Sequence, residues 1–227
     1  MAEMKFFIVL FSRLILAFSI FSLLLFLPAN TFDWPEAWAF IIILLTYGII
    51  LHFLIFQDDP TVEKSRKRYR PVFKFDFIIL TLAGICFLLM FIITGFDVGL
   101  FHWTSPYVIH LFKYLGFSAF TCSLLVYMLV MRENSYLSRV IETQKKQKII
   151  TTGPYSLVRH PMYSGNILFM ISIPIALGSI LALVPAILFL ILFLPRIFFE
   201  ERILITEFEE YRQYCKHVRY RLIPKIW

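Results

Sequence analysis

Long apolar runs constrain this chain more than any other feature. Four of them, Phe6 to Pro28, Ala37 to Phe56, Asp76 to Gly95 and Tyr107 to Met131, have about the 20 residues that a helix needs to cross the hydrocarbon core of a bilayer. With 59% hydrophobic residues and 26 Phe among 227, the chain holds more apolar side chain than a soluble domain of this size can bury. We therefore predict an all-α integral membrane protein, a polytopic helical bundle.

The basic residues divide the connecting segments into two kinds. The links at 29–36 and 96–106 contain no Lys or Arg, whereas 57–75 and 132–160 contain six each. Loops rich in Lys and Arg stay in the cytoplasm, so four crossings with both termini cytoplasmic satisfy every loop. Topology and anionic headgroups then explain the net charge of +7, and no nucleic-acid partner is expected.

The apolar run from Pro161 to Arg196 fits one long tilted span, two full spans or a hairpin that returns to the same face. Arg159 precedes the run, and Arg196 is followed by six further Lys or Arg residues. These basic flanks put both ends in the cytoplasm. They favour a tight two-helix hairpin that turns at Gly178-Ser179.

A polar and aromatic segment, TTGPYSLVRHPMY at 151–163, precedes this hairpin. Gly153-Pro154 predicts a turn. Pro161 disfavours a helical conformation for His160 and suits the first position of a new helix. We therefore expect Arg159 and His160 at a helix start, where unpaired N–H groups and the helix dipole favour an anion such as a carboxylate or phosphate.

A second charged cluster follows the hairpin, in the run RIFFEERIL. Arg196 and Glu200 are four residues apart and share a helix face, while Glu201 points about 100° away. Carboxylates so close to hydrocarbon need cationic partners, and the hairpin brings Arg159 and His160 within reach. A ligand with a carboxylate and an ammonium group would satisfy both clusters. No metal site is predicted, because the three cysteines are scattered.

Both clusters belong to a longer series of motifs. The runs ITTGPYSLVRHPMYSG, PIALGS, RIFFEERIL and YRQYCKHVRYRLIPKIW occur in this order between about Asn134 and Trp227. Together they resemble the C-terminal half of the isoprenylcysteine carboxyl methyltransferase family, particularly its bacterial members, with the phospholipid N-methyltransferases as looser relatives. The resemblance implies an integral membrane enzyme that uses S-adenosylmethionine and, in a bacterium, lies in the inner membrane.

The resemblance also divides the chain and implies site residues. Residues 1–131 form four spans with the basic loop at 57–75, and residues 132–227 form the cofactor-binding catalytic region. Arg196, on the substrate side, and Glu201, which supports its neighbour, are assigned to catalysis. The cofactor-binding residues that the resemblance implies are Gln144, Lys148, Ile149, Ile150, Tyr155, His160, Pro161, Met162, Tyr163 and Glu200. Arg159 is added to them because of its place at the helix start.

Within that set each chemical group of the cofactor has an expected partner. His160, Arg159 and the helix start at Pro161 are expected to bind its carboxylate. Glu200 pairs with its amino group or its ribose. The rings of Tyr155 and Tyr163 are expected to pack on its adenosyl part.

The acceptor is expected to be a lipophilic small molecule, a prenylated group or a membrane lipid. An acceptor carboxylate could be oriented by Arg196 and would need no general base. An acceptor amine would need a carboxylate such as Glu201 to take its proton.

Two other classes of protein stay open. The membrane sterol and steroid reductases share an Arg-His-Pro-x-Tyr-x-Gly run and use NADPH, but their run typically continues with an acidic residue, where this chain has Asn166. A non-catalytic lipid-binding membrane protein on the same scaffold is the other class. The complete set of pocket motifs argues against it.

Overall fold

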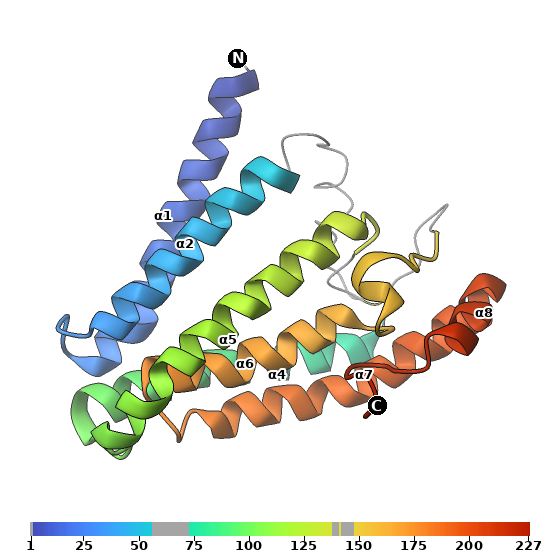
Figure 1. The fold of residues 1–227 in the computed structure, drawn as a ribbon. Helices are drawn as coiled ribbons and strands as arrows, with labels where there is room; N and C mark the ends of the chain where they lie inside the picture. The colour runs from blue at the N-terminus through green and yellow to red at the C-terminus, as the bar shows by residue number, and fades with distance from the viewer. Residues whose placement is uncertain (1, 56–72, 138–140, 142–147) are drawn as a thin grey trace.

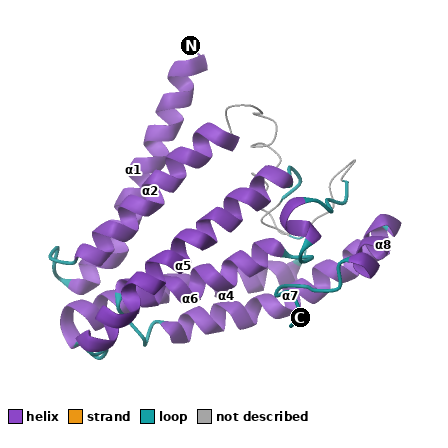
Figure 2. Cartoon of the chain, viewed as in Figure 1, coloured by secondary structure: helices purple, strands orange, loops and turns teal. Residues whose placement is uncertain are grey.

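The computed structural model describes residues 2–55, 73–137, 141 and 148–227. Within these ranges all regular structure is helical (Figure 2), which confirms the predicted all-α membrane bundle. Most of the predicted basic loop at 57–75 lies outside the described residues. The helices are α1 (Ala2–Ala29), α2 (Pro35–Ile55), α4 (Lys74–Phe96), the π-helical turn η1 (Asp97–Phe101), α5 (Pro106–Glu133), the 3₁₀ turn η2 (Gly153–Ser156), α6 (Pro161–Leu177), α7 (Leu183–Glu207) and α8 (Glu209–His217).

Five of the described helices are long and apolar enough to cross a membrane. Four of them, α1, α2, α4 and α5, are the four predicted spans, and the fifth is α7. The shorter α6 forms the predicted hairpin with α7. The turn begins at Gly178, whose φ of 95° lies in the left-handed region that glycine adopts without strain.

The helices form an elongated bundle in which segments distant in sequence lie side by side (Figure 1). α5 packs along α6 and α4 packs along α7, while α1 contacts both α2 and α4. The rings of Phe40, Phe91 and Phe120 are fully buried where these helices meet. The α1–α2 link, η1 and the α6–α7 turn gather at one end, whereas η2 and α8 lie at the other (Figure 1). The latter is called the α8 end below.

A buried carboxylate ties the hairpin turn to the rest of the bundle. Asp97, 1% exposed, accepts hydrogen bonds from the Thr104 amide at 2.8 Å and the Thr104 hydroxyl at 2.6 Å. The Ser179 hydroxyl, in the turn itself, donates to the same carboxylate at 2.6 Å. Thr104 in turn accepts a bond from the Ile180 amide at 3.0 Å. The turn is therefore fixed against the link between α4 and α5, and this orients the far end of the hairpin.

Close packing between α5 and α6 depends on a glycine. A Cβ atom added to Gly116 would lie 2.4 Å from the backbone nitrogen of Ala176, a distance that real Cβ atoms do not show. Small residues let membrane helices approach closely enough for backbone packing. The approach of these two helices therefore requires glycine at position 116.

We predict that Gly116→Ala lowers the midpoint of thermal unfolding of the detergent-solubilised protein. The added methyl group forces α5 and α6 apart, and overpacking of this kind costs about 1–3 kcal/mol. Gly84→Ala is the matched control, because a Cβ atom at Gly84 meets nothing within 4 Å. Both changes raise intrinsic helix propensity, so Gly84→Ala should leave the midpoint unchanged or higher. Equal responses of the two variants would contradict the close approach.

Candidate functional site at the α8 end of the hairpin

The polar segment before α6 folds as its prolines and glycine predict. Gly153 has a φ of 57° and opens η2. His160 is the residue before the helix, with φ −124° and ψ 64°, and Pro161 is the first residue of α6. His160 and its neighbour Arg159 are therefore held at the start of α6, facing the last turns of α7.

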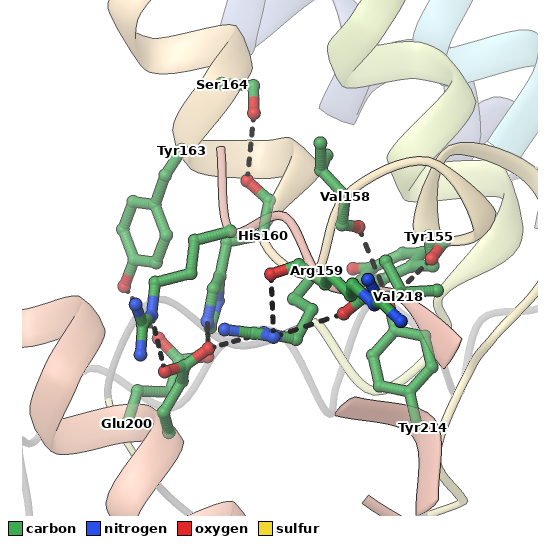
Figure 3. A network of polar contacts seen from close by, with 12 residues as sticks. Tyr155, Val158, Arg159, His160, Tyr163, Ser164, Glu200, Tyr214 and Val218 are labelled. Carbon is green, nitrogen blue, oxygen red and sulfur yellow. Dashed lines mark hydrogen bonds and ion pairs between the residues drawn. The ribbon is translucent and has the colours of Figure 1, made fainter. Parts of the chain in front are cut away.

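Glu201 is the centre of the polar network at this end, and its partners Arg159 and His160 are labelled in Figure 3. Its side chain is buried, and its Oε1 accepts a 2.7 Å hydrogen bond from Arg159 Nε. His160 Nε2 lies 3.3 Å from the same oxygen. Oε2 accepts a 2.7 Å bond from Arg221 Nε. The predicted meeting of the two charged clusters across the hairpin is confirmed.

The C-terminal segment pairs with the backbone of Arg159 and His160. The amide of Arg159 donates to the Tyr220 carbonyl, and that of His160 donates to the Arg221 carbonyl, both at 2.9 Å. The Arg159 guanidinium also donates to the carbonyls of Val218 and Arg219 at 3.1 Å. Residues 218–221 therefore pair with the stretch that directly precedes α6.

Glu200, the other member of the acidic pair, points to a different neighbour. Its half-buried carboxylate accepts a 2.7 Å hydrogen bond from the Tyr163 hydroxyl. The Tyr163 ring packs between His160 and Phe193, with ring centroids 5.7 and 5.6 Å away. Glu200 and Tyr163 thus form a second polar contact beside the Glu201 network.

Arg196 is held one turn before Glu200 by an acid from another helix. Asp76, in the first turn of α4, is fully buried, and its Oδ1 accepts a 2.8 Å hydrogen bond from Arg196 Nε. Its Oδ2 accepts the amide of Ile141 at 3.0 Å. The guanidinium also lies 5.4 Å from the ring centroid of Phe193. Asp76 therefore fixes Arg196 and joins α4, α7 and the loop after α5.

An aromatic group, which we name the Tyr155 cluster, lies on the other side of the network. Its buried members are Val130, Tyr155, Tyr211 and Tyr214, and Ile149, Ile150 and Met162 pack against them. The Tyr155 hydroxyl accepts a 2.7 Å bond from the Asn134 amide group, and the Tyr214 hydroxyl donates to the Tyr155 carbonyl at 2.6 Å. Burial raises the pKa of the Tyr214 phenol, which keeps it a donor at neutral pH.

The predicted site residues therefore fall into distinct groups. Ile149, Ile150, Tyr155 and Met162 gather in the Tyr155 cluster. Tyr163 lies instead with Phe193, Ile197 and Leu222, on the opposite side of His160 from Tyr155 (Figure 3). Lys148 is exposed, and Gln144 lies outside the described residues. Arg159, His160 and Glu201 meet directly, Glu200 joins Tyr163, and Arg196 joins Asp76.

Sequence reasoning missed three groups that complete the site. Asp76 carried a usable signal, since an acid at the start of an apolar span needs a partner, and Arg196 was available. Arg221 was one of several basic residues in the C-terminal segment, and nothing distinguished it from the others. Tyr211 and Tyr214 are spaced by one helical turn, which does not reveal what their hydroxyl groups face.

Fold and site together define an integral membrane protein with a charged, aromatic site at one end of a helical hairpin. Residues 111–211 match the phospholipid methyltransferase family. The matched range runs from α5 into α8 and includes the Arg159-His160 segment and the acidic pair Glu200-Glu201 of α7. The predicted resemblance to this group of membrane methyltransferases is confirmed.

The chain is also similar to a Delta(14)-sterol reductase of Methylotuvimicrobium alcaliphilum. The two are 29% identical over 93 residues, which cover 40% of this chain and 22% of the reductase. The matched part thus spans about a fifth of the length of that relative. The family match supports a membrane methyltransferase, while the similarity to the reductase is confined to this shorter stretch.

We predict that Glu201→Ala strongly destabilises the protein. The change leaves Arg159 and His160 buried without their carboxylate partner, and loss of one member of a buried ion pair costs about 3–5 kcal/mol. Glu209→Ala is the control, because its ion pair with Arg212 is exposed and such pairs contribute at most about 1 kcal/mol. Thermal unfolding in detergent should show a large loss for the first variant and little change for the second. Similar midpoints would mean that Glu201 does not hold this end of the hairpin together.

Proposed function

We propose that the protein transfers a methyl group from S-adenosylmethionine to a lipophilic acceptor that reaches the site from the membrane. The observation that carries this proposal is the contact of the His160 segment with the acidic pair of α7, inside the stretch that matches the phospholipid methyltransferase family. This contact brings cationic, anionic and aromatic groups together at one end of the hairpin. Such a combination suits a small zwitterion with an attached nucleoside.

The groups present fit the chemical parts of S-adenosylmethionine. An ammonium group needs a carboxylate, a carboxylate needs a donor or a cation, and an adenine ring needs an apolar and aromatic surface. We assign the half-buried Glu200 to the amino group, and His160 with the start of α6 to the carboxylate. The Tyr155 cluster takes the adenosyl part. Arg159, whose guanidinium binds Glu201 and the C-terminal segment, acts by holding this arrangement together.

The contribution of the protein to the reaction is then alignment. When bound, the cofactor supplies a methyl group that its sulfonium already makes electrophilic. Holding two reactants in the correct orientation lowers a barrier by about 7–11 kcal/mol. The Glu201 network fixes His160 and the start of α6, and Asp76 fixes Arg196. The two reactants thus meet side chains whose own positions are already set.

The acceptor group that suits this site best is a carboxylate. We assign Arg196 to orient it, since a guanidinium matches the geometry of a carboxylate. A carboxylate is already deprotonated and needs no general base. The alternative, an amine acceptor, requires a base, and Glu201 is poorly suited because Arg159 and Arg221 neutralise its charge. A prenylated or other lipid-borne carboxylate is the proposed substrate.

Membrane orientation follows from the origin of the cofactor. S-adenosylmethionine is a cytosolic compound, so the α8 end and both termini would face the cytoplasm. In a bacterial cell the protein would lie in the inner membrane. A lipid-borne acceptor would reach the same end from within the bilayer.

We predict that Glu200→Gln weakens binding of S-adenosylhomocysteine by about tenfold, a change of about 1.4 kcal/mol. The substitution keeps the shape and an acceptor for the Tyr163 hydroxyl but removes the charge that pairs with the amino group. Isothermal titration calorimetry on the detergent-solubilised protein measures the change. Glu207→Gln, on an exposed residue of the same helix, should bind like the wild type.

The same titration separates this proposal from its rival. A wild-type protein that binds NADPH and not S-adenosylhomocysteine would favour the reductase reading, which the similarity to the Delta(14)-sterol reductase keeps open. Equal binding by Glu200→Gln and the wild type would remove Glu200 from the cofactor site.

We predict that membranes containing the protein incorporate methyl label from S-adenosylmethionine into a lipid-soluble product, and that the label is released by alkali. A methyl ester of a carboxylate hydrolyses in base and gives labelled methanol, whereas an N-methyl group resists this treatment. Membranes without the protein are the control. Label that stays bound after alkaline treatment would contradict the carboxylate acceptor and favour an amine.

A further inference from the structure

Tyr211 presents a buried polar atom that the assignments above leave unexplained. The residue lies in the first turn of α8, and its side chain is only 4% exposed. Among the residues that the structure describes, its hydroxyl group has no hydrogen-bond partner. A buried group without a partner costs about 1–3 kcal/mol, so native proteins rarely keep one without a reason.

Three neighbouring tyrosines at this end provide the contrast. Tyr214, one turn further along α8, donates to the Tyr155 carbonyl at 2.6 Å. The Tyr155 hydroxyl accepts from Asn134, and the Tyr163 hydroxyl donates to Glu200, both at 2.7 Å. Each of these three hydroxyl groups therefore has a role inside the protein. Tyr211 is the member of the Tyr155 cluster for which the described residues supply none.

The surroundings of Tyr211 indicate what its hydroxyl group can serve. It belongs to the cluster against which Ile149, Ile150 and Met162 pack, the residues expected to hold the cofactor. Burial raises the pKa of the Tyr211 phenol, and the nearby Glu201, Cys215 and Glu200 raise it further, so the group stays protonated. A neutral donor and acceptor thus lies among aliphatic and aromatic side chains, beside the Glu201 network.

We propose that Tyr211 is a cofactor-binding residue whose hydroxyl group forms a hydrogen bond to the adenosyl part of S-adenosylmethionine. This inference rests on the function proposed above. A purine ring packs well on aliphatic and aromatic side chains but carries nitrogen atoms that need polar partners. A phenol both donates and accepts, so it can serve a ring nitrogen, an exocyclic amine or a ribose hydroxyl. The bond to the cofactor gives this buried hydroxyl the partner that the described residues do not provide.

The test compares Tyr211→Phe with Tyr214→Phe in the full-length, detergent-solubilised protein. Both variants lose only a hydroxyl group from the same helix. Tyr211→Phe should weaken S-adenosylhomocysteine binding by about fivefold, the effect of one neutral hydrogen bond. Without ligand, it should unfold at the same temperature as the wild type or higher. Tyr214→Phe should unfold at a lower temperature, because its hydroxyl bonds the Tyr155 carbonyl.

A second ligand tests which part of the cofactor Tyr211 contacts. 5′-Methylthioadenosine keeps the adenosyl part and lacks the amino acid. Tyr211→Phe should weaken its binding by the same factor as that of S-adenosylhomocysteine, whereas Glu200→Gln should leave it unchanged. A Tyr211→Phe effect confined to S-adenosylhomocysteine would overturn the adenosyl assignment.

The remaining outcomes separate this inference from the proposed function. Wild-type binding that Tyr211→Phe leaves within twofold overturns the role of Tyr211 and keeps the methyltransferase proposal. A loss of stability in ligand-free Tyr211→Phe equal to that of Tyr214→Phe also overturns it, because the hydroxyl would then have a partner within the protein. If the wild type binds neither ligand, the proposed function fails, and the inference fails with it.

Discussion

The buried charge of Glu201 is the constraint on which the arrangement of the site depends. A carboxylate at the end of a membrane-crossing helix is costly unless charged or polar donors surround it. Arg159, His160 and Arg221 supply those donors from two separate segments of the chain. One acid therefore joins the end of α7 to the start of α6 and to the C-terminal segment. Residues far apart in sequence are held within one small volume.

The opposite end of the hairpin is fixed by the same kind of interaction. Asp97 accepts bonds from Thr104 and Ser179 and secures the turn. Asp76 pairs with Arg196 in the same way near the α8 end. Each acid is buried and each bonds a different pair of segments, so the hairpin is anchored at both ends. A hairpin anchored in this way can hold groups in the fixed geometry that alignment of two reactants requires.

Much of this could be predicted from the sequence, because the physics involved is local. The apolar runs predicted the spans, and the basic residues on both flanks of the last apolar run favoured a hairpin that turns at Gly178-Ser179. Pro161 gave the start of α6 for a similarly local reason. The approach of His160 to Glu201 followed from the hairpin, since two helices joined by a short turn bring their outer ends together.

Pairings between distant segments could not be predicted from the sequence. The C-terminal segment bonds the backbone of Arg159 and His160, and no sequence pattern indicates which extended residues lie against a given loop. Tyr163 likewise does not lie beside Tyr155, with which it was expected to pack on the adenosyl part of the cofactor. Its hydroxyl bonds Glu200, and that bond turns its ring toward Phe193 and away from Tyr155. A tyrosine with a polar partner is oriented by that partner, and the partner is known only from the fold.

The balance of charge at the site bears on the choice between the two candidate cofactors, S-adenosylmethionine and NADPH. NADPH carries three phosphate groups and needs a surplus of cationic side chains to bind them. Here Arg159 and Arg221 share the single carboxylate of Glu201, and Arg196 is paired with Asp76. Glu200 adds a carboxylate whose hydrogen bond comes from the neutral Tyr163 hydroxyl. Such a site favours a ligand that is itself cationic at one end, as S-adenosylmethionine is at its ammonium and sulfonium groups, over a polyanionic dinucleotide. The balance of Arg159, Arg221 and Arg196 by the carboxylates of Glu201, Asp76 and Glu200 is thus the strongest physical reason to prefer methyl transfer over hydride transfer.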